Sequence, residues 1–166
     1  MQEKLLKQLQ TWAQSGDGDC MYKLAKTYQS QGDLPKYVEW LNKSAEAKNF
    51  DAMKEYAAYL CKCADYEKAF VIYKELAETF CDEESMEAMV DMTERGQGVV
   101  KNDKGTLNFI LELINKCYNE IYLIDSGNIF ARTLVFQTRR HNECTWEYLQ
   151  AVERRRIAAR IRKLLA

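Results

Sequence analysis

The residues with the clearest potential for chemistry are glycines in and just after the segment GQGVVKND, residues 96–103. Only 7 of the 166 residues are glycine, and Gly96, Gly98 and Gly105 fall within ten positions. A glycine-rich loop can cradle a phosphate, but a dinucleotide-binding fingerprint needs a preceding strand and a third glycine where Lys101 stands. The P-loop pattern is absent as well. We therefore interpret this segment as a connection between two helices.

Cysteine and histidine offer the other routes to chemistry. Cys61 and Cys63 are two positions apart, so on a helix they point about 200° apart and do not converge on one metal ion. The single histidine, His141, lies three residues before Cys144, and no further residue completes a catalytic triad. We interpret the acidic run at residues 82–84 as solvated or capping charge. The sequence thus predicts no catalytic, cofactor-binding or metal-binding residue, and no enzyme.

The composition predicts a globular, all-helical protein. It is 47% hydrophobic and 30% charged, with a single proline, Pro35. The opening residues, MQEKLLKQLQTW, lack the pattern of a signal peptide, and no apolar run is long enough to cross a bilayer. We therefore expect a cytoplasmic protein with no membrane partner, whose six cysteines are reduced thiols.

A repeat of helical hairpins is visible when the sequence is compared with itself. The segments that begin at Asp19 and Asp51 match at a shift of 32, and each places apolar residues at the spacing of one helix face. Between the two helices of the first copy, Gly32 suits a helix end and Asp33 can cap the next helix. A third copy starts near Glu84, and GQGVV is an insertion between its helices.

These units resemble tetratricopeptide repeats, and the third resembles the Sel-one-like branch of that superfamily. The linker of that branch has the pattern G-x-G-V followed by an acidic position, which Gly96, Gly98, Val99 and Asp103 fill. The resemblance covers roughly residues 19–118 and leads us to predict an all-α fold, a right-handed α-solenoid of helix-turn-helix repeats. The solenoid, residues 1–141, would comprise an N-terminal helix at 2–14, repeats at about 19–50, 51–82 and 84–118, and a segment at 119–141.

The segment at 119–141 does not fit the repeat. Its apolar residues allow another helix, whereas the β-branched and aromatic residues that flank a Gly-Asn pair allow a β-hairpin. The sequence leaves both alternatives open.

The resemblance also implies a binding surface, because the first helices of such repeats line a concave face. Six residues on this face are the candidates for contact with a partner: Tyr22, Lys26, Lys54, Glu87, Asp91 and Glu94. The set from the third repeat is acidic, which would favour a basic protein or peptide partner. The alternative is an ordinary polar face in contact with solvent.

Charge is distributed unevenly along the chain. Residues 132–166 carry a net charge of +6 and residues 1–131 a net charge of −7. A long C-terminal helix at 142–166 has an apolar stripe and five arginines at Arg154, Arg155, Arg156, Arg160 and Arg162. It can cap the solenoid, bind an acidic partner or nucleic acid phosphates, or join two copies of the chain in a homodimer.

The leading hypothesis is a non-enzymatic adaptor or scaffold that binds a protein or peptide partner through the concave face of its repeats. The alternative is a nucleic-acid-associated regulator that uses the arginines of the C-terminal helix.

Overall fold

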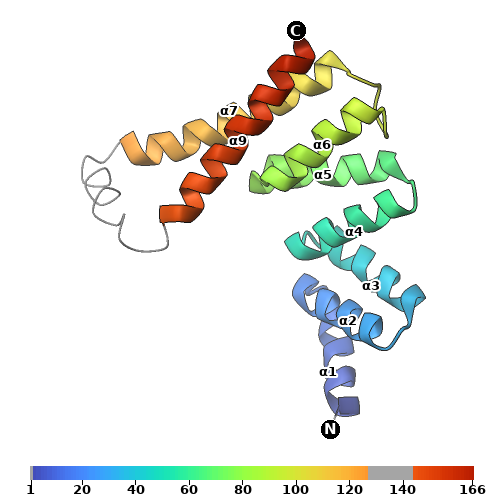
Figure 1. Ribbon diagram of the computed structural model, residues 1–166. Helices are drawn as coiled ribbons and strands as arrows, with labels where there is room; N and C mark the ends of the chain where they lie inside the picture. Colours follow the sequence, from blue (N-terminus) through green and yellow to red (C-terminus); the bar gives the residue numbers. More distant parts are fainter. Residues whose placement is uncertain (1, 127–143) are drawn as a thin grey trace. The chain divides into compact units, whose positions relative to one another are not determined.

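The computed structural model describes residues 2–126 and 144–166, and within them the side chains of residues 7–117 and 152–166. Every regular element in this part of the chain is an α-helix, so the predicted all-α class is confirmed there. The helices, labelled as in Figure 1, are α1 (Gln2–Gln14), α2 (Gly18–Ser30), α3 (Leu34–Glu46), α4 (Phe50–Lys62), α5 (Tyr66–Phe80), α6 (Glu83–Arg95), α7 (Lys104–Ser126) and α9 (Cys144–Leu165).

Short-range chemistry explains where these helices begin and end. Five of them start directly after a side chain that accepts a backbone N–H of the first turn, namely Asp17, Asp33, Asn49, Asp82 and Asp103. Gly32 has a φ of 77°, a left-handed conformation that glycine adopts without strain. The predicted roles of Gly32 and Asp33 at the turn between the first two repeat helices are confirmed.

The segment predicted at 119–141 falls only partly within the described residues. Residues 119–126 belong to α7, which therefore extends well past the end of the third repeat. Residues 127–141, where the sequence allows a helix or a hairpin, lie outside the described residues, as does His141.

The chain divides into two compact units, residues 1–76 and 77–166. In the first unit α1 packs on α2, α2 on α3, and α3 on α4 (Figure 1). Its core is apolar, and its members include Leu24, Ala25, Leu41, Met53 and Leu76. Each large side chain buried in this way stabilises the fold by about 1.5–3 kcal/mol.

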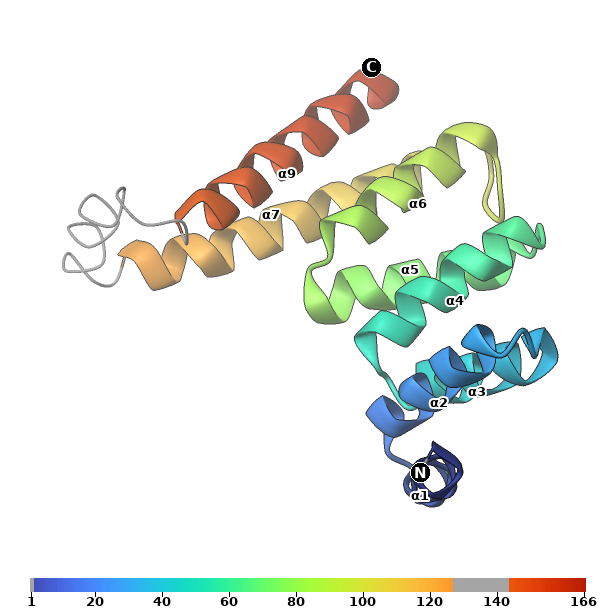
Figure 2. The same cartoon turned by 60° about the horizontal axis from the view of Figure 1, so that its bottom comes forward.

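The second unit is built on α6, α7 and α9, which pack against one another in all three pairs (Figure 2). Its fully or almost fully buried apolar side chains include Met86, Met89, Leu107, Ile110, Ile157 and Ile161. Because Ile157 and Ile161 belong to α9, the C-terminal helix lays an apolar stripe on the third repeat. Of the three alternatives for this helix, capping is the contact seen in the structure.

A disulfide joins two of the six cysteines. Cys81 follows α5 and Cys117 lies in α7, with their Cα atoms 6.0 Å apart, a separation typical of disulfides. The expectation that all six cysteines are reduced is therefore wrong for this pair. The repeat pattern predicted a helical hairpin at about residues 84–118, but it does not fix the packing that brings Cys81 and Cys117 within bonding distance. Cys20, Cys61 and Cys63 are free thiols.

Among the described helices, none is both long and apolar enough to cross a membrane.

Candidate partner-binding surfaces

Three helices of the first unit converge on the carboxylate of Glu55. Tyr22 of α2 and Tyr37 of α3 each donate a phenolic hydrogen bond to it, at 2.8 and 2.9 Å. Glu55 belongs to α4, and the ammonium of Lys26, also on α2, lies 2.9 Å from its carboxylate. These bonds hold Tyr22 and Lys26, two of the predicted contact residues, in fixed positions. The side chain of Lys26 remains 43% exposed.

The pKa values of this cluster follow from its geometry. Burial raises the pKa of Tyr22 to about 12, with further contributions from the hydrogen bond to Glu55 and the negative charge of that residue. The pKa of Tyr37 is raised for the same reasons. Burial alone would raise the pKa of Glu55, but the hydrogen bonds from Lys26, Tyr22 and Tyr37 outweigh it, so the pKa is lowered. The cluster therefore consists of neutral phenols around an ionised carboxylate at neutral pH.

Lys54 lies on α4, one residue before Glu55, and is half-buried. Its ammonium is 5.2 Å from the centroid of the Phe50 ring, a favourable cation–π distance. We call Tyr22, Lys26, Lys54 and Glu55 the α2–α4 surface. It combines aromatic, cationic and anionic groups that are partly exposed and held in place by neighbouring side chains.

The acidic residues predicted for the third repeat are in contact with α9. Arg160 Nε is 3.0 Å from Glu94 Oε1, and Arg160 Nη2 is 2.6 Å from Asp91 Oδ1. Arg156 Nη2 is 2.5 Å from Glu87 Oε1. The structure thus brings Glu87, Asp91 and Glu94 together as predicted, but the cationic helix that they bind belongs to the same chain.

The five arginines of α9 divide into two groups. Arg156 and Arg160 pair with α6, and Arg154 is only 5% exposed and pairs with Glu83. Arg155 and Arg162 are exposed and form no ion pair within the described residues. They are seven positions apart, so they lie on one face of the helix. Two of the five predicted phosphate contacts are therefore both exposed and unpaired within the described residues.

Glu83 and Arg154 form a contact that the sequence pattern did not predict. The side chains are 14% and 6% exposed, and Arg154 Nε has no hydrogen-bond partner in the described part of the chain. Glu83 was expected to be a solvated or capping charge, which is wrong, because α9 covers it. Within the acidic run at residues 82–84, Asp82 is the residue that caps α6. The four-residue spacing from Glu83 to Glu87 is the signal that places both on one face of α6.

The segment GQGVVKND connects α6 to α7. Gly96 ends α6 in a left-handed conformation with a φ of 70°, and Gly98 has a φ of 72°. The backbone N–H of Asn102 donates to the carbonyl of Thr93 at 2.8 Å, which draws the loop back onto α6. Asp103 accepts the N–H of Thr106 at 2.6 Å at the start of α7. Gly96, Gly98 and Asp103 of the linker pattern therefore each have a role in the turn.

Potential metal ligands are dispersed in the described residues. No group of three or more His, Cys, Asp or Glu side chains within them is arranged to hold a metal ion. Cys61 is half-buried in α4, and Cys63 is exposed at its C-cap. His141 and the side chain of Cys144 lie outside the described residues.

No protein-family model and no curated protein matches the sequence. The resemblance to tetratricopeptide and Sel-one-like repeats is carried by the repeat pattern, and the packing of consecutive helices within each unit is compatible with it.

Proposed function

We propose that this protein is a non-enzymatic adaptor or scaffold that binds a protein or peptide partner and acts in the cytoplasm. In this proposal its hairpins form a tetratricopeptide-like or Sel-one-like solenoid with a right-handed superhelix. Supporting it is the packing of α1 to α4 in chain order, which places the first helices α2 and α4 beside a common partner helix, α3.

The α2–α4 surface is the proposed partner site. The observation that carries this assignment is the Glu55 cluster, which fixes Tyr22 and Lys26 while leaving Lys26 partly exposed. A side chain already held in its bound geometry loses less conformational entropy when a partner binds, so fixed polar and aromatic groups favour recognition. The acidic face of α6 is the weaker candidate, because α9 already pairs with Glu87, Asp91 and Glu94.

Paired neutralising substitutions test the α2–α4 surface. The test variant carries Lys26→Gln and Lys54→Gln, and the control variant carries Lys36→Gln and Lys43→Gln on α3, with the same change in net charge. Partners captured from native lysate with the full chain are identified by mass spectrometry, and their affinity is then measured with purified proteins. We expect about tenfold weaker binding for the test variant, from roughly 0.7 kcal/mol per lost contact.

The control variant should bind like the wild type, and both variants should retain the helical circular dichroism spectrum. Equal affinity of the test variant and the wild type would rule out the α2–α4 surface.

The alternative function, a nucleic-acid-associated regulator, is supported by the exposed face of α9 that carries Arg155, Arg162 and Lys163. If these three cations contact phosphates, log affinity falls with log salt at a slope of up to about 2.7. Contacts from all five arginines of α9 and Lys163 would give a slope of about 5.4. A titration of duplex DNA at several salt concentrations distinguishes these values. No binding at low salt would exclude this function.

A further inference from the structure

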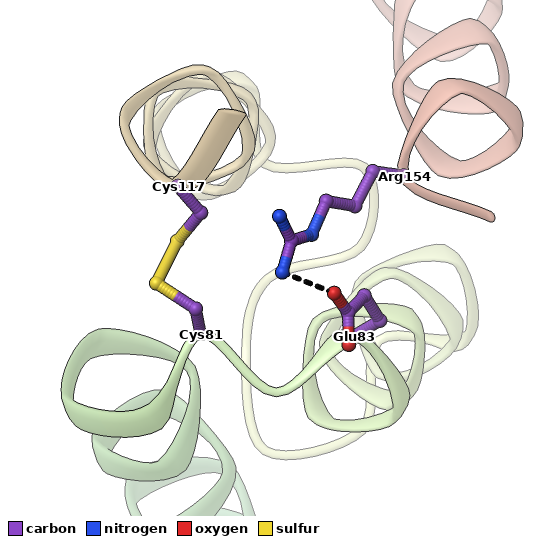
Figure 3. Close-up of a disulfide and its surroundings, with 4 residues drawn as sticks. All are labelled: Cys81, Glu83, Cys117 and Arg154. Carbon is purple, nitrogen blue, oxygen red and sulfur yellow. Dashed lines mark ion pairs between the residues drawn. A yellow bond between two sulfur atoms is a disulfide. The ribbon is translucent and has the colours of Figure 1, made fainter. Parts of the chain in front are cut away.

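The turn at residues 81–83 connects three helices of the second unit. At one end Cys81 is bonded to Cys117 of α7, and at the other Glu83 pairs with Arg154 of α9. Figure 3 shows the Arg154 side chain reaching from α9 towards the turn, with its guanidinium between the disulfide and Glu83. Only two positions in the sequence therefore separate the disulfide-bonded Cys81 from Glu83, which pairs with α9.

The two sulfur atoms differ in access. Cys117 is 2% exposed, whereas Cys81 is half-buried at the start of the turn. An external thiolate must approach a disulfide sulfur directly, so we expect attack at the more exposed residue, Cys81, with Cys117 as the leaving group.

The contact made by Arg154 depends on the position of the turn. The guanidinium is buried, its Nε has no hydrogen-bond partner in the described part of the chain, and Glu83 is its counter-ion. A buried charge that loses its counter-ion is strongly destabilised. The disulfide ties the residue before the cap of α6 to α7, and α9 packs on both α6 and α7. Opening the bond therefore removes the covalent link between the two helices that hold α9.

We propose that Cys81–Cys117 is a thiol–disulfide exchange site for a dithiol reductant, and that its reduction weakens the binding of α9 to α6. A thiolate of the reductant attacks Cys81 Sγ, and the electron pair of the S–S bond passes to Cys117 Sγ, which takes up a proton. The second thiol of the reductant, as its thiolate, attacks the mixed disulfide and releases Cys81 as a thiolate, which is then protonated. The protein gains two electrons and two protons, and the dithiol becomes a disulfide.

Release of α9 would expose a surface of α6 that α9 covers while the disulfide is intact. Glu87, Asp91 and Glu94 would lose Arg156 and Arg160, so the acidic face of α6 would become available to another cationic segment. This inference goes beyond the proposed function, because the coupling between the disulfide and α9 exists whether or not a partner binds.

Thermodynamic linkage gives the proposal a quantitative test. If the disulfide strengthens α9 docking by some factor, α9 docking must strengthen the disulfide by the same factor. The full chain is equilibrated in buffers of reduced and oxidised dithiothreitol, and the fraction of open disulfide is measured by maleimide labelling and mass spectrometry. We expect Arg154→Gln to shift the equilibrium about tenfold towards the reduced form. The matched control, Arg155→Gln at the adjacent exposed arginine, should stay within about twofold of the wild type.

A second measurement requires no substitution. Hydrogen exchange of residues 152–165 is compared in the oxidised and reduced wild-type chain, with peptides from α2 and α3 as the internal reference. We expect exchange in α9 to accelerate about tenfold on reduction, while the reference peptides are unchanged. Equal protection of α9 in both redox states would overturn the proposal, as would an unchanged redox equilibrium in a folded Arg154→Gln variant. If that variant does not fold, the wild-type comparison decides.

Discussion

Removal of the disulfide should lower the free energy of unfolding of residues 77–166 by several kcal/mol. The bond joins residues 36 positions apart in the sequence. In the chain-entropy model, a closed loop of that length removes about 13 cal/mol/K from the unfolded state, which corresponds to about 3.8 kcal/mol at 25 °C. The variant is Cys81→Ser with Cys117→Ala, because Cys117 is buried and a serine hydroxyl there would need a hydrogen-bond partner.

Urea unfolding of the full chain measures this loss. Far-UV circular dichroism follows the helices, and hydrogen exchange of peptides from α6 and α9 assigns the transition to the second unit. With a typical slope of about 1.3 kcal/mol/M, the midpoint of that transition should fall by about 3 M. Reduction of the wild-type chain with a phosphine should produce the same fall, since it opens the same loop.

The control is Cys63→Ser, which replaces an exposed free thiol and should change the stability by less than about 0.5 kcal/mol. A midpoint shift below about 0.8 M for the double variant, or no effect of the phosphine, would refute the predicted stabilisation by the disulfide. Either result would mean that the loop is not closed in solution or that the unfolded chain gains little freedom when it opens.

Three further predictions concern the ion pair, the tyrosine cluster and the glycine linker. Arg154→Met should destabilise the second unit by about 3–5 kcal/mol, because it leaves Glu83 without its counter-ion. Urea unfolding measures this loss, and adding Glu83→Gln should restore most of the lost stability. The pKa of Tyr22 is raised to about 12, so its bond to Glu55 should be complete below about pH 10 and lost as the pH rises through 12. The difference in absorbance at 295 nm between the wild type and Tyr22→Phe follows the ionisation of Tyr22 as the pH rises. A midpoint near pH 10 would contradict the prediction. Gly96→Ala should cost about 1–2 kcal/mol in thermal unfolding, because φ is 70° and the new Cβ would lie 3.1 Å from that of Lys101.

The helical class was predictable because its signals are local. Apolar residues recur at helical spacing, and Gly32 and Asp33 mark a helix end and a cap through groups only a few residues away. The role of Gly96 as a helix terminator follows in the same way from its conformational freedom.

The candidate site was only partly predictable. The sequence placed Glu87, Asp91 and Glu94 on one face, but it left open whether the arginines of α9 would meet them in the same chain or elsewhere. A charge pattern shows which groups have opposite charge, but it does not show whether they pair within one molecule or between two molecules. Only packing of the apolar stripe of α9 on α6 and α7 selects the intramolecular arrangement.

The sequence by itself therefore determined the helices, their turns and the uneven charge of this protein, since each depends on interactions within a few residues. The tertiary structure decided which cysteines pair, which arginines are neutralised and which remain exposed. Cys81 and Cys117, or Glu83 and Arg154, are far apart along the chain, and the contact between each pair depends on how the helices of the second unit pack. That packing depends on the fit of many side chains at once, which no short pattern in the sequence encodes.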